Sequence, residues 1–160
     1  MKIGNREFAE NNHTYIMGIL NVTPDSFSDG GKFNHLDQAL THVGEMIRDG
    51  ADVVDIGGES TRPGGYTKIS DEEEIARVVP VIEAVKREFD IPVSIDTYKS
   101  GVARAAAEAG ADLINDIWGL KYDEKMAGVI AEKQLACCLM HNREKAEYRN
   151  FMEEMKQDLR

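Results

Sequence analysis

The feature that most constrains this 160-residue sequence is a repeated alternation of short apolar runs with longer amphipathic segments. The apolar runs have the length of buried strands, and they cover residues 15–20, 52–56, 93–97, 113–117 and 135–140. Between them lie segments whose apolar residues recur every three or four positions, the pattern of a helix with one buried face. Strands that alternate with helices in this way predict an α/β fold with parallel strands and right-handed crossovers.

Residues that favour helix ends border several of the amphipathic segments. Asn34 is expected to cap a helix that Gly50 ends. Ser70 and Glu73 form a capping box, and we interpret the acidic run 71–74 as first-turn charge that favours the helix dipole. We also expect a hairpin within residues 1–10, an Ala-rich helix before Gly110, a helix near 124–132 and a helical tail over 144–160.

The chain carries an excess of acidic residues, which gives a formal net charge of −10. This charge argues against a nucleic acid or an anionic membrane surface as the partner. No apolar run approaches the roughly 18 residues of a membrane span, and residues 1–7 lack the apolar core of a signal peptide. Cys137 and Cys138 are neighbours in an apolar run, so we expect reduced packing residues and a cytoplasmic location.

Hydrogen-bonding side chains lie at or just beyond the end of each expected strand. They are Asn21, Asp55, Glu59, Asp96, Asn115, Asp116 and His141. In a barrel the carboxyl ends of parallel strands meet at one mouth, and polar groups near an apolar interior are costly unless paired. We therefore expect these side chains to bond to one another or to a ligand. For Asp55 and Asp116, a purely structural role as acceptors for loop N–H groups stays open.

Length by itself favours an open sheet, although residue identities also bear on the architecture. Five strands in 160 residues suit an open doubly wound sheet, whereas a (β/α)₈ barrel needs about 250 residues. The glycine-rich run 57–65 lacks the signatures of a P-loop and of a dinucleotide site, and the four histidines lack the spacing of a zinc site. Thr61 and Arg62 lie side by side in that run, a pairing that suits an anionic oxygen such as phosphate.

Two long motifs resemble the dihydropteroate synthase family. Residues 17–31, Met-Gly-Ile-Leu-Asn-Val-Thr-Pro-Asp-Ser-Phe-Ser-Asp-Gly-Gly, resemble its first signature, and residues 55–64, Asp-Ile-Gly-Gly-Glu-Ser-Thr-Arg-Pro-Gly, resemble its second. Residues 94–97, 115–117 and 139–141 match later strands of the family in order and spacing. The resemblance implies the first five strand–helix units of a (β/α)₈ TIM-type barrel after a short amino-terminal hairpin. Residues 1–160 would then form a partial pterin-binding barrel domain.

The resemblance also implies an activity, in which para-aminobenzoate displaces diphosphate from a dihydropterin methyl diphosphate in folate biosynthesis. The matching positions are Asn21 for Mg²⁺ with the diphosphate, Thr61 and Arg62 for the diphosphate side, Asp96 and Asn115 for the polar edge of the pterin, Ile117 and Met140 for its apolar faces, Phe27 and Pro63 for the para-aminobenzoate pocket, and Asp29 for the reacting methylene. Asp29 and Arg62 are the expected catalytic residues. The aryl amine is already neutral at pH 7, so departure of diphosphate is the difficult step, and Mg²⁺ would assist it.

The resemblance further implies that later strands of the family supply another pterin-binding Asp, a Lys and an Arg/His pair, together with the helices of a homodimer. We therefore expect residues 1–160 by themselves not to turn over substrate and to self-associate through the open edges of the first and fifth strands. Two alternatives stay open. One is a pterin-binding methyltransferase that serves corrinoid proteins, and the other is a non-catalytic pterin-binding fragment.

Overall fold

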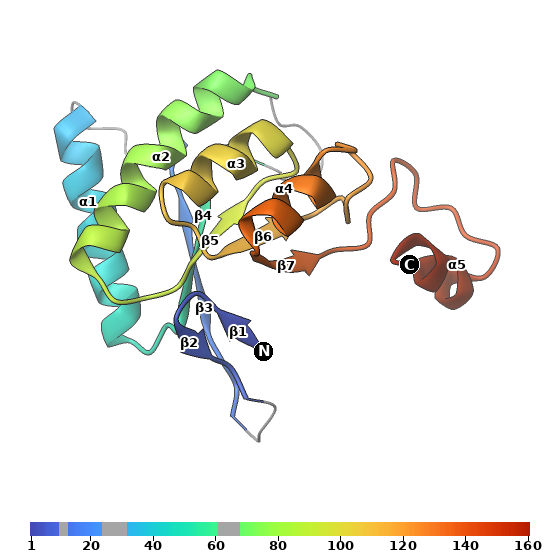
Figure 1. Ribbon diagram of the computed structural model, residues 1–160, viewed down its shortest axis with the longest axis horizontal. Coiled ribbons are helices and arrows are strands. Elements are labelled where there is room, and N and C mark those ends of the chain that lie inside the picture. The colour runs from blue at the N-terminus through green and yellow to red at the C-terminus, as the bar shows by residue number, and fades with distance from the viewer. Residues whose placement is uncertain (10–12, 24–31, 61–67) are drawn as a thin grey trace.

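The computed structural model of the chain describes residues 1–9, 13–23, 32–60 and 68–160. A five-stranded parallel sheet forms its centre, with a small two-stranded antiparallel hairpin at the amino terminus (Figure 1). In chain order the elements are β1 (Lys2–Ile3), β2 (Arg6–Glu7), β3 (Met17–Asn21), α1 (Lys32–Arg48), β4 (Val53–Gly57), α2 (Asp71–Glu88), β5 (Val93–Asp96), α3 (Ser100–Glu108), β6 (Leu113–Asp116), α4 (Met126–Lys133), β7 (Ala136–Leu139) and α5 (Phe151–Asp158).

The order of the strands distinguishes the two architectures that length left open. The sheet runs β3-β4-β5-β6-β7, so every strand pairs with its neighbour in the sequence. Helices α1 to α4 contact one another in the same order and lie side by side along one face of the sheet (Figure 1). A doubly wound sheet would reverse its strand order and carry helices on both faces. The open sheet that length favours is therefore wrong, and the chain folds as five successive units of a barrel wall.

Residues alternate between the two faces of this sheet. Leu20, Ile56 and Ile95 point toward the helices, where they are almost completely buried in the main hydrophobic core. The opposite face, which we call the open face, carries two registered rows of residues: Ile19, Asp55, Ser94, Leu113 and Ala136, then Asn21, Gly57, Asp96, Asn115 and Cys138. The second row lies nearer the carboxyl ends of the strands and is mostly polar.

The amino-terminal hairpin covers the other end of the open face. Ile3 and Phe8 form a second buried cluster with Val53 and Leu113. This packing confirms the hairpin expected for residues 1–10, and it covers the amino-terminal end of the open face with apolar side chains. The polar row therefore occupies the end of the open face that lies away from the hairpin.

Most helix boundaries agree with those expected from the sequence, but two do not. Ser70 caps α2 by accepting a hydrogen bond from the Glu73 N–H (3.2 Å), as expected. The cap expected at Asn34 is wrong, because α1 already begins at Lys32 and nothing between the preceding glycine pair and Asn34 breaks a helix.

The charged tail is helical only over α5, so the helix expected across 144–160 is wrong in its first part. The Glu154 carboxylate accepts hydrogen bonds from the N–H groups of Arg149 and Asn150, both at 2.8 Å. Arg143 donates to the Glu147 carbonyl at 3.2 Å. Because these side chains use backbone groups that a longer helix would need, the helix begins only after Asn150.

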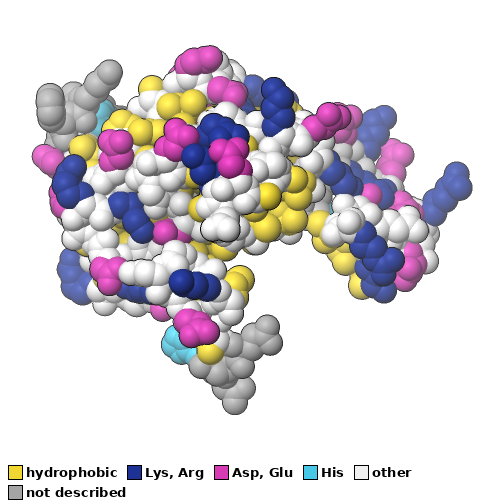
Figure 2. Space-filling view, viewed as in Figure 1, with side chains coloured by type: hydrophobic (Ala, Val, Ile, Leu, Met, Phe, Trp, Pro, Cys, Tyr) yellow, Lys and Arg dark blue, Asp and Glu magenta, His cyan; other side chains and the backbone are white. Residues whose placement is uncertain are grey.

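The two outer strands leave apolar groups exposed. Within the described residues, β3 and β7 each pair with one strand only. Ile19 is 64 % exposed and Met140 is 46 % exposed, and hydrophobic side chains gather around α4 and β7 on the face shown in Figure 2. Cys137 and Cys138 are free thiols, but both are exposed on β7, so the packing role expected for them is wrong. Self-association through these edges stays a prediction.

Among the described residues, no helix has both the length and the apolar character that crossing a membrane requires.

We expect Gly58→Ala to lower the free energy of unfolding by about 1–3 kcal/mol, since it adds a methyl group to a filled space. A Cβ at Gly58 would lie 2.7 Å from Val78 Cγ1 and 3.0 Å from Glu74 Cγ, and both residues are buried on α2. Urea denaturation followed by circular dichroism measures the change.

Gly128 provides the matched control. It lies within α4, and a Cβ there would meet nothing within 4 Å. Gly128→Ala should raise the free energy of unfolding by about 0.5–1 kcal/mol through helix propensity. Equal stability changes in the two variants would contradict the close packing of Gly58 against α2.

Candidate functional site

The polar row at the carboxyl edge of the open face brings together residues from four neighbouring strands. Asn21, Gly57, Asp96 and Asn115 are paired in register across β3 to β6. Gly57 has no side chain, and a Cβ built on it would lie 3.5 Å from Asn21 Oδ1 and 3.6 Å from Asp96 Oδ2. The oxygens of Asn21 and Asp96 therefore flank the space above Gly57. This arrangement places three of the strand-end residues expected from the sequence, Asn21, Asp96 and Asn115, on one edge.

A partly buried hydrogen bond orients the amide of Asn115. Its Nδ2 donates to Asp55 Oδ2 at 3.1 Å. Asp55 is 5 % exposed, and this burial raises the pKa of its carboxyl group, although the bond from Asn115 works against the rise. With one N–H of Nδ2 bound to Asp55, the amide is held in orientation, and Asn115 can offer its carbonyl oxygen and its second N–H to a ligand.

A structural role as acceptor for loop N–H groups stayed open for Asp55 and Asp116, and the structure supports it for Asp116. Asp116 accepts hydrogen bonds from the N–H groups of Trp118 and Leu120, both at 2.8 Å, so it stabilises the turn after β6. Asp55 instead accepts from a side chain, and its function is to orient Asn115.

Asp96 is the most perturbed group of the row. Its Oδ1 is buried and has no hydrogen-bond partner among the described residues. Burial first, and then the negative charge of Asp55, raise the pKa of Asp96 to about 7. One row below, the Ser94 hydroxyl lies against the Asp55 carboxylate and opposes the rise of the Asp55 pKa. Buried acceptors of this kind are costly unless donors reach them, so the site suits a ligand with a row of N–H groups.

The ammonium group of Lys99, the residue just before α3, is buried. Lys99 Nζ donates to Glu59 Oε2 at 2.8 Å and to Glu74 Oε2 at 2.7 Å. Burial by itself would lower the pKa of Lys99, but the bonds to the two carboxylates outweigh it and raise the pKa. Burial raises the pKa of Glu74, whereas Lys99 and Tyr98 together overcome burial and lower the pKa of Glu59.

Sequence reasoning missed this cluster. It singled out Glu59 as a strand-end group, did not consider Lys99, and assigned Glu74 only a favourable interaction with the helix dipole as first-turn charge. Glu74 is in fact 1 % exposed, because the fourth residue of α2 faces β4 rather than solvent. The available signal was its helical spacing from the buried Val78, four positions later, which places both side chains on one helix face.

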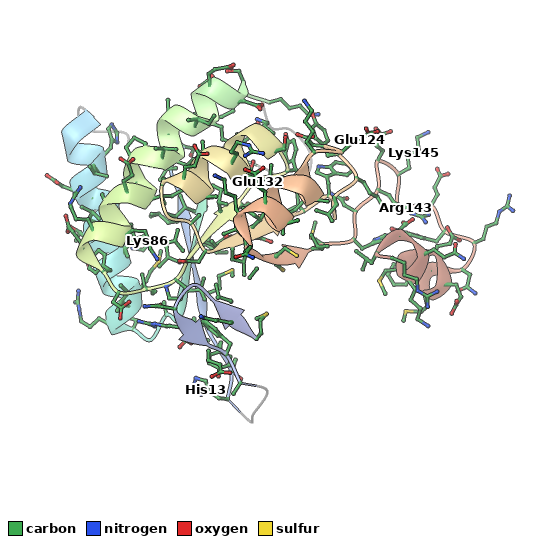
Figure 3. All side chains as sticks on the ribbon, in the orientation of Figure 1. His13, Lys86, Glu124, Glu132, Arg143 and Lys145 are labelled. Carbon is green, nitrogen blue, oxygen red and sulfur yellow. The ribbon has the colours of Figure 1, made fainter. Side chains whose placement is uncertain are left out.

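The remaining expected site residues have different surroundings. Ile117 is half-buried just after β6, and Met140 is exposed just after β7. His141 pairs with Asp158 of α5 at 2.8 Å, so it holds the tail and does not join the polar row. Arg143, labelled in Figure 3, binds the same carboxylate at 2.7 Å. Phe27, Asp29, Thr61, Arg62 and Pro63 lie outside the described residues.

The fit of a divalent cation depends on Asn21. Among the described residues, no three His, Cys, Asp or Glu side chains form a cluster that could hold a metal ion. Asn21 is exposed, and its Oδ1 lies on the same face of the sheet as the Asp96 carboxylate, across the space above Gly57. An amide oxygen beside a carboxylate matches the hard oxygen ligands of Mg²⁺, which usually completes its shell with water and substrate phosphate. The residues present therefore fit Mg²⁺ only together with an anionic ligand.

Fold and site together define a class. Successive strand–helix units form a TIM-barrel wall, and the polar side chains gather at the carboxyl ends of the strands, where enzymes of that fold bind their substrates. The family model described as pterin binding enzyme matches residues 17–160. The chain therefore belongs to the pterin-binding enzyme family.

Individual relatives carry a more specific name. The dihydropteroate synthase of Clostridium beijerinckii is 64% identical over all 160 residues, which make up 59% of that protein. The crystal structure of the Clostridium difficile dihydropteroate synthase, obtained in the presence of pteroic acid, has a TM-score of 0.88 and 49% identity, covering 99% of this chain and 58% of that one. The Xanthomonas albilineans dihydropteroate synthase with 4-aminobenzoic acid has a TM-score of 0.81 and 42% identity, covering 92% and 54%. The chain thus spans little more than half the length of these relatives.

Asp96→Asn should change the way in which stability depends on pH. The folded chain holds the Asp96 proton more tightly than the unfolded chain, because folding raises the pKa from 3.8 to about 7. Ionising Asp96 therefore costs stability, and this cost grows as the pH rises between these two values. The variant carries no such cost, so we expect its stability relative to wild type to increase between about pH 5 and about pH 8 in urea titrations.

Asp37→Asn, which neutralises an exposed carboxylate on α1, is the matched control. A stability difference between Asp96→Asn and wild type that is the same at both pH values would show that burial does not perturb Asp96.

Proposed function

We propose that this chain supplies the amino-terminal, pterin-binding part of a dihydropteroate synthase. This transferase joins para-aminobenzoate to a dihydropterin methyl diphosphate and releases diphosphate. The observation that carries the proposal is the buried Oδ1 of Asp96, which has no hydrogen-bond partner among the described residues and lies beside an Asn115 amide that Asp55 orients. Relatives that share half or more of these residues bear the name of this enzyme.

The geometry suits the polar edge of a pterin. That edge presents N–H donors and ring-nitrogen acceptors in a row, and a site built on buried polar groups rejects analogues that lack them. Asp96 accepts from the donors in its ionised form, and the Asn115 carbonyl accepts at the neighbouring position. Ile117 and Met140, which follow β6 and β7, would flank the apolar faces of the ring. Donors on the ligand would stabilise the ionised carboxylate, so binding should lower the pKa of Asp96.

The diphosphate side of the proposal depends on Mg²⁺ and on residues outside the described ranges. Mg²⁺ would neutralise charge on the leaving diphosphate, and Asn21 would hold it at the end of β3. The other assignments follow from the motifs: Thr61 and Arg62 for the diphosphate, Phe27 and Pro63 for para-aminobenzoate, and Asp29 as an anion that would stabilise positive charge on the reacting methylene. Carboxylates dominate the described site, so an anionic substrate would need the cation.

A pterin-binding methyltransferase for corrinoid proteins would share the Asp and Asn pair but would not need a diphosphate site. The similarity of the whole chain to dihydropteroate synthases does not favour this alternative. Binding of diphosphate in the presence of Mg²⁺ distinguishes the two.

We expect Asp96→Asn to weaken the binding of a dihydropterin methyl diphosphate by about 2–4 kcal/mol, because the amide sets a donor against the donors of the pterin. Isothermal titration calorimetry on residues 1–160 measures binding without requiring turnover. Wild-type affinity should also fall below about pH 7, where Asp96 takes up its proton. Asp37→Asn on α1 should bind as wild type does, and near wild-type affinity in Asp96→Asn would reduce Asp96 to a structural role.

Asn21→Ala should reduce the effect of Mg²⁺ on diphosphate binding. We expect Mg²⁺ to raise the affinity of the wild-type chain for inorganic diphosphate, and we expect the variant to lose at least about 10-fold of that gain. Calorimetric titrations of diphosphate with and without Mg²⁺ give both values. An equal Mg²⁺ effect in both proteins would remove Asn21 from the metal site and leave the pterin assignment standing.

A further inference from the structure

One buried charged cluster holds both ends of the segment that carries Thr61 and Arg62. The described chain stops at residue 60 and resumes at residue 68. On the near side, Glu59 Oε2 accepts from Lys99 Nζ at 2.8 Å. On the far side, Lys99 Nζ donates to the Ile69 carbonyl at 2.8 Å, and the Ile69 N–H donates to the same Glu59 oxygen at 3.0 Å. Residues ten positions apart are thus joined through one carboxylate and one ammonium.

Every donor of the ammonium is used in this way. Lys99 carries three N–H groups, and three acceptors surround it: Glu59, Glu74 and the Ile69 carbonyl. The Lys99 side chain is 8 % exposed, and those of Glu59 and Glu74 are 3 % and 2 % exposed. The cluster therefore has a single geometry, set from the start of α3 and the first turn of α2.

Further contacts brace the same two ends. Arg77 of α2 donates to the Gly58 carbonyl at 2.8 Å, and the Tyr98 hydroxyl donates to Glu59. Lys68 lies with its Nζ 4.9 Å from the centre of the Tyr122 ring, and Tyr122 packs edge-on against Tyr98 with the ring centres 4.4 Å apart. The two ends are consequently tied to β5, α2 and the segment after β6.

Stability does not explain such a cluster. Taking two carboxylates and an ammonium out of water costs about as much as their attraction returns, and apolar residues of similar volume often serve equally well. What apolar residues cannot do is bind the N–H and the carbonyl of Ile69 while also binding Glu59. The chemistry of the cluster is matched to the ends of the segment, not to the core around it.

We infer that Lys99 is a positioning residue for the diphosphate side of the site. Through Glu59 and the Ile69 carbonyl it holds together the two described residues that lie on either side of Thr61 and Arg62 in the sequence. The consequence for diphosphate rests on the proposed function, whereas the restraint on the two ends does not.

Hydrogen exchange tests the restraint directly. Lys99→Met leaves two buried carboxylates without their partner, so the double variant Lys99→Met with Glu74→Gln is the second protein to examine, because it removes one of those charges. In both, the Ile69 N–H should exchange faster by about 10-fold or more, and trypsin should cut faster between Lys68 and Ile69. The matched control is Lys86→Met, which removes a Lys–Asp pair of 2.8 Å between Lys86, labelled on α2 in Figure 3, and Asp112.

Measuring the affinity for inorganic diphosphate tests the consequence of this restraint for the diphosphate side of the site. With Mg²⁺ present, the double variant should bind inorganic diphosphate about 10-fold or more weakly than wild type, while its affinity for a dihydropterin without phosphate stays unchanged. A structural defect alone would weaken both ligands. Unchanged exchange at Ile69, or faster exchange with unchanged diphosphate affinity, would overturn the inference. A wild-type chain that binds neither ligand would instead overturn the proposed function, and the exchange of Ile69 would still decide whether Lys99 restrains the two ends.

Discussion

Parallel pairing in sequence order places the carboxyl end of every strand from β3 to β7 at the same edge of the sheet. Helices α1 to α4 lie together on one face of the sheet, which leaves the other face for a ligand. The amino-terminal hairpin then covers the opposite end of that face with Ile3 and Phe8. One polar edge is therefore the only place in the described sheet where Asn21, Asp96 and Asn115 can act together.

The electrostatics of this edge follow from its composition. Carboxylates outnumber cations around Asp96, and burial together with their charge moves its pKa to about 7. The buried ammonium of Lys99 does not relieve this, since its three donors are committed to Glu59, Glu74 and the Ile69 carbonyl. The described site is thus rich in acceptors and poor in donors. Such a site selects a ligand that brings N–H groups, and it admits an anion only in the company of a cation.

Much of the framework was predictable because local pattern and tertiary environment agree there. Each apolar run became a strand within one or two residues of its expected bounds, and Ser70 capped α2 as its spacing indicated. Predictions were wrong where the surroundings of a segment, and not its own pattern, decide its structure. Nothing near Cys137 shows that β7 is an outer strand, and nothing before Asn150 shows that Arg143 and Glu154 take up the backbone groups of the tail.

The sequence by itself determined the strand–helix repeat, the polar residues at the strand ends and, through two long motifs, the family. It did so because strand and helix periodicity and glycine-rich signatures are local properties of the chain. Only the tertiary structure decided that Asp55 orients Asn115, that Asp116 stabilises a turn, and that Lys99 joins Glu59 to Glu74. The pairings of Asp55 with Asn115 and of Lys99 with Glu59 and Glu74 connect residues 25 to 60 positions apart, and the pairing with Glu74 also depends on which face of α2 is buried. Side-chain chemistry permits many such pairs, and the packing of sheet against helices selects among them.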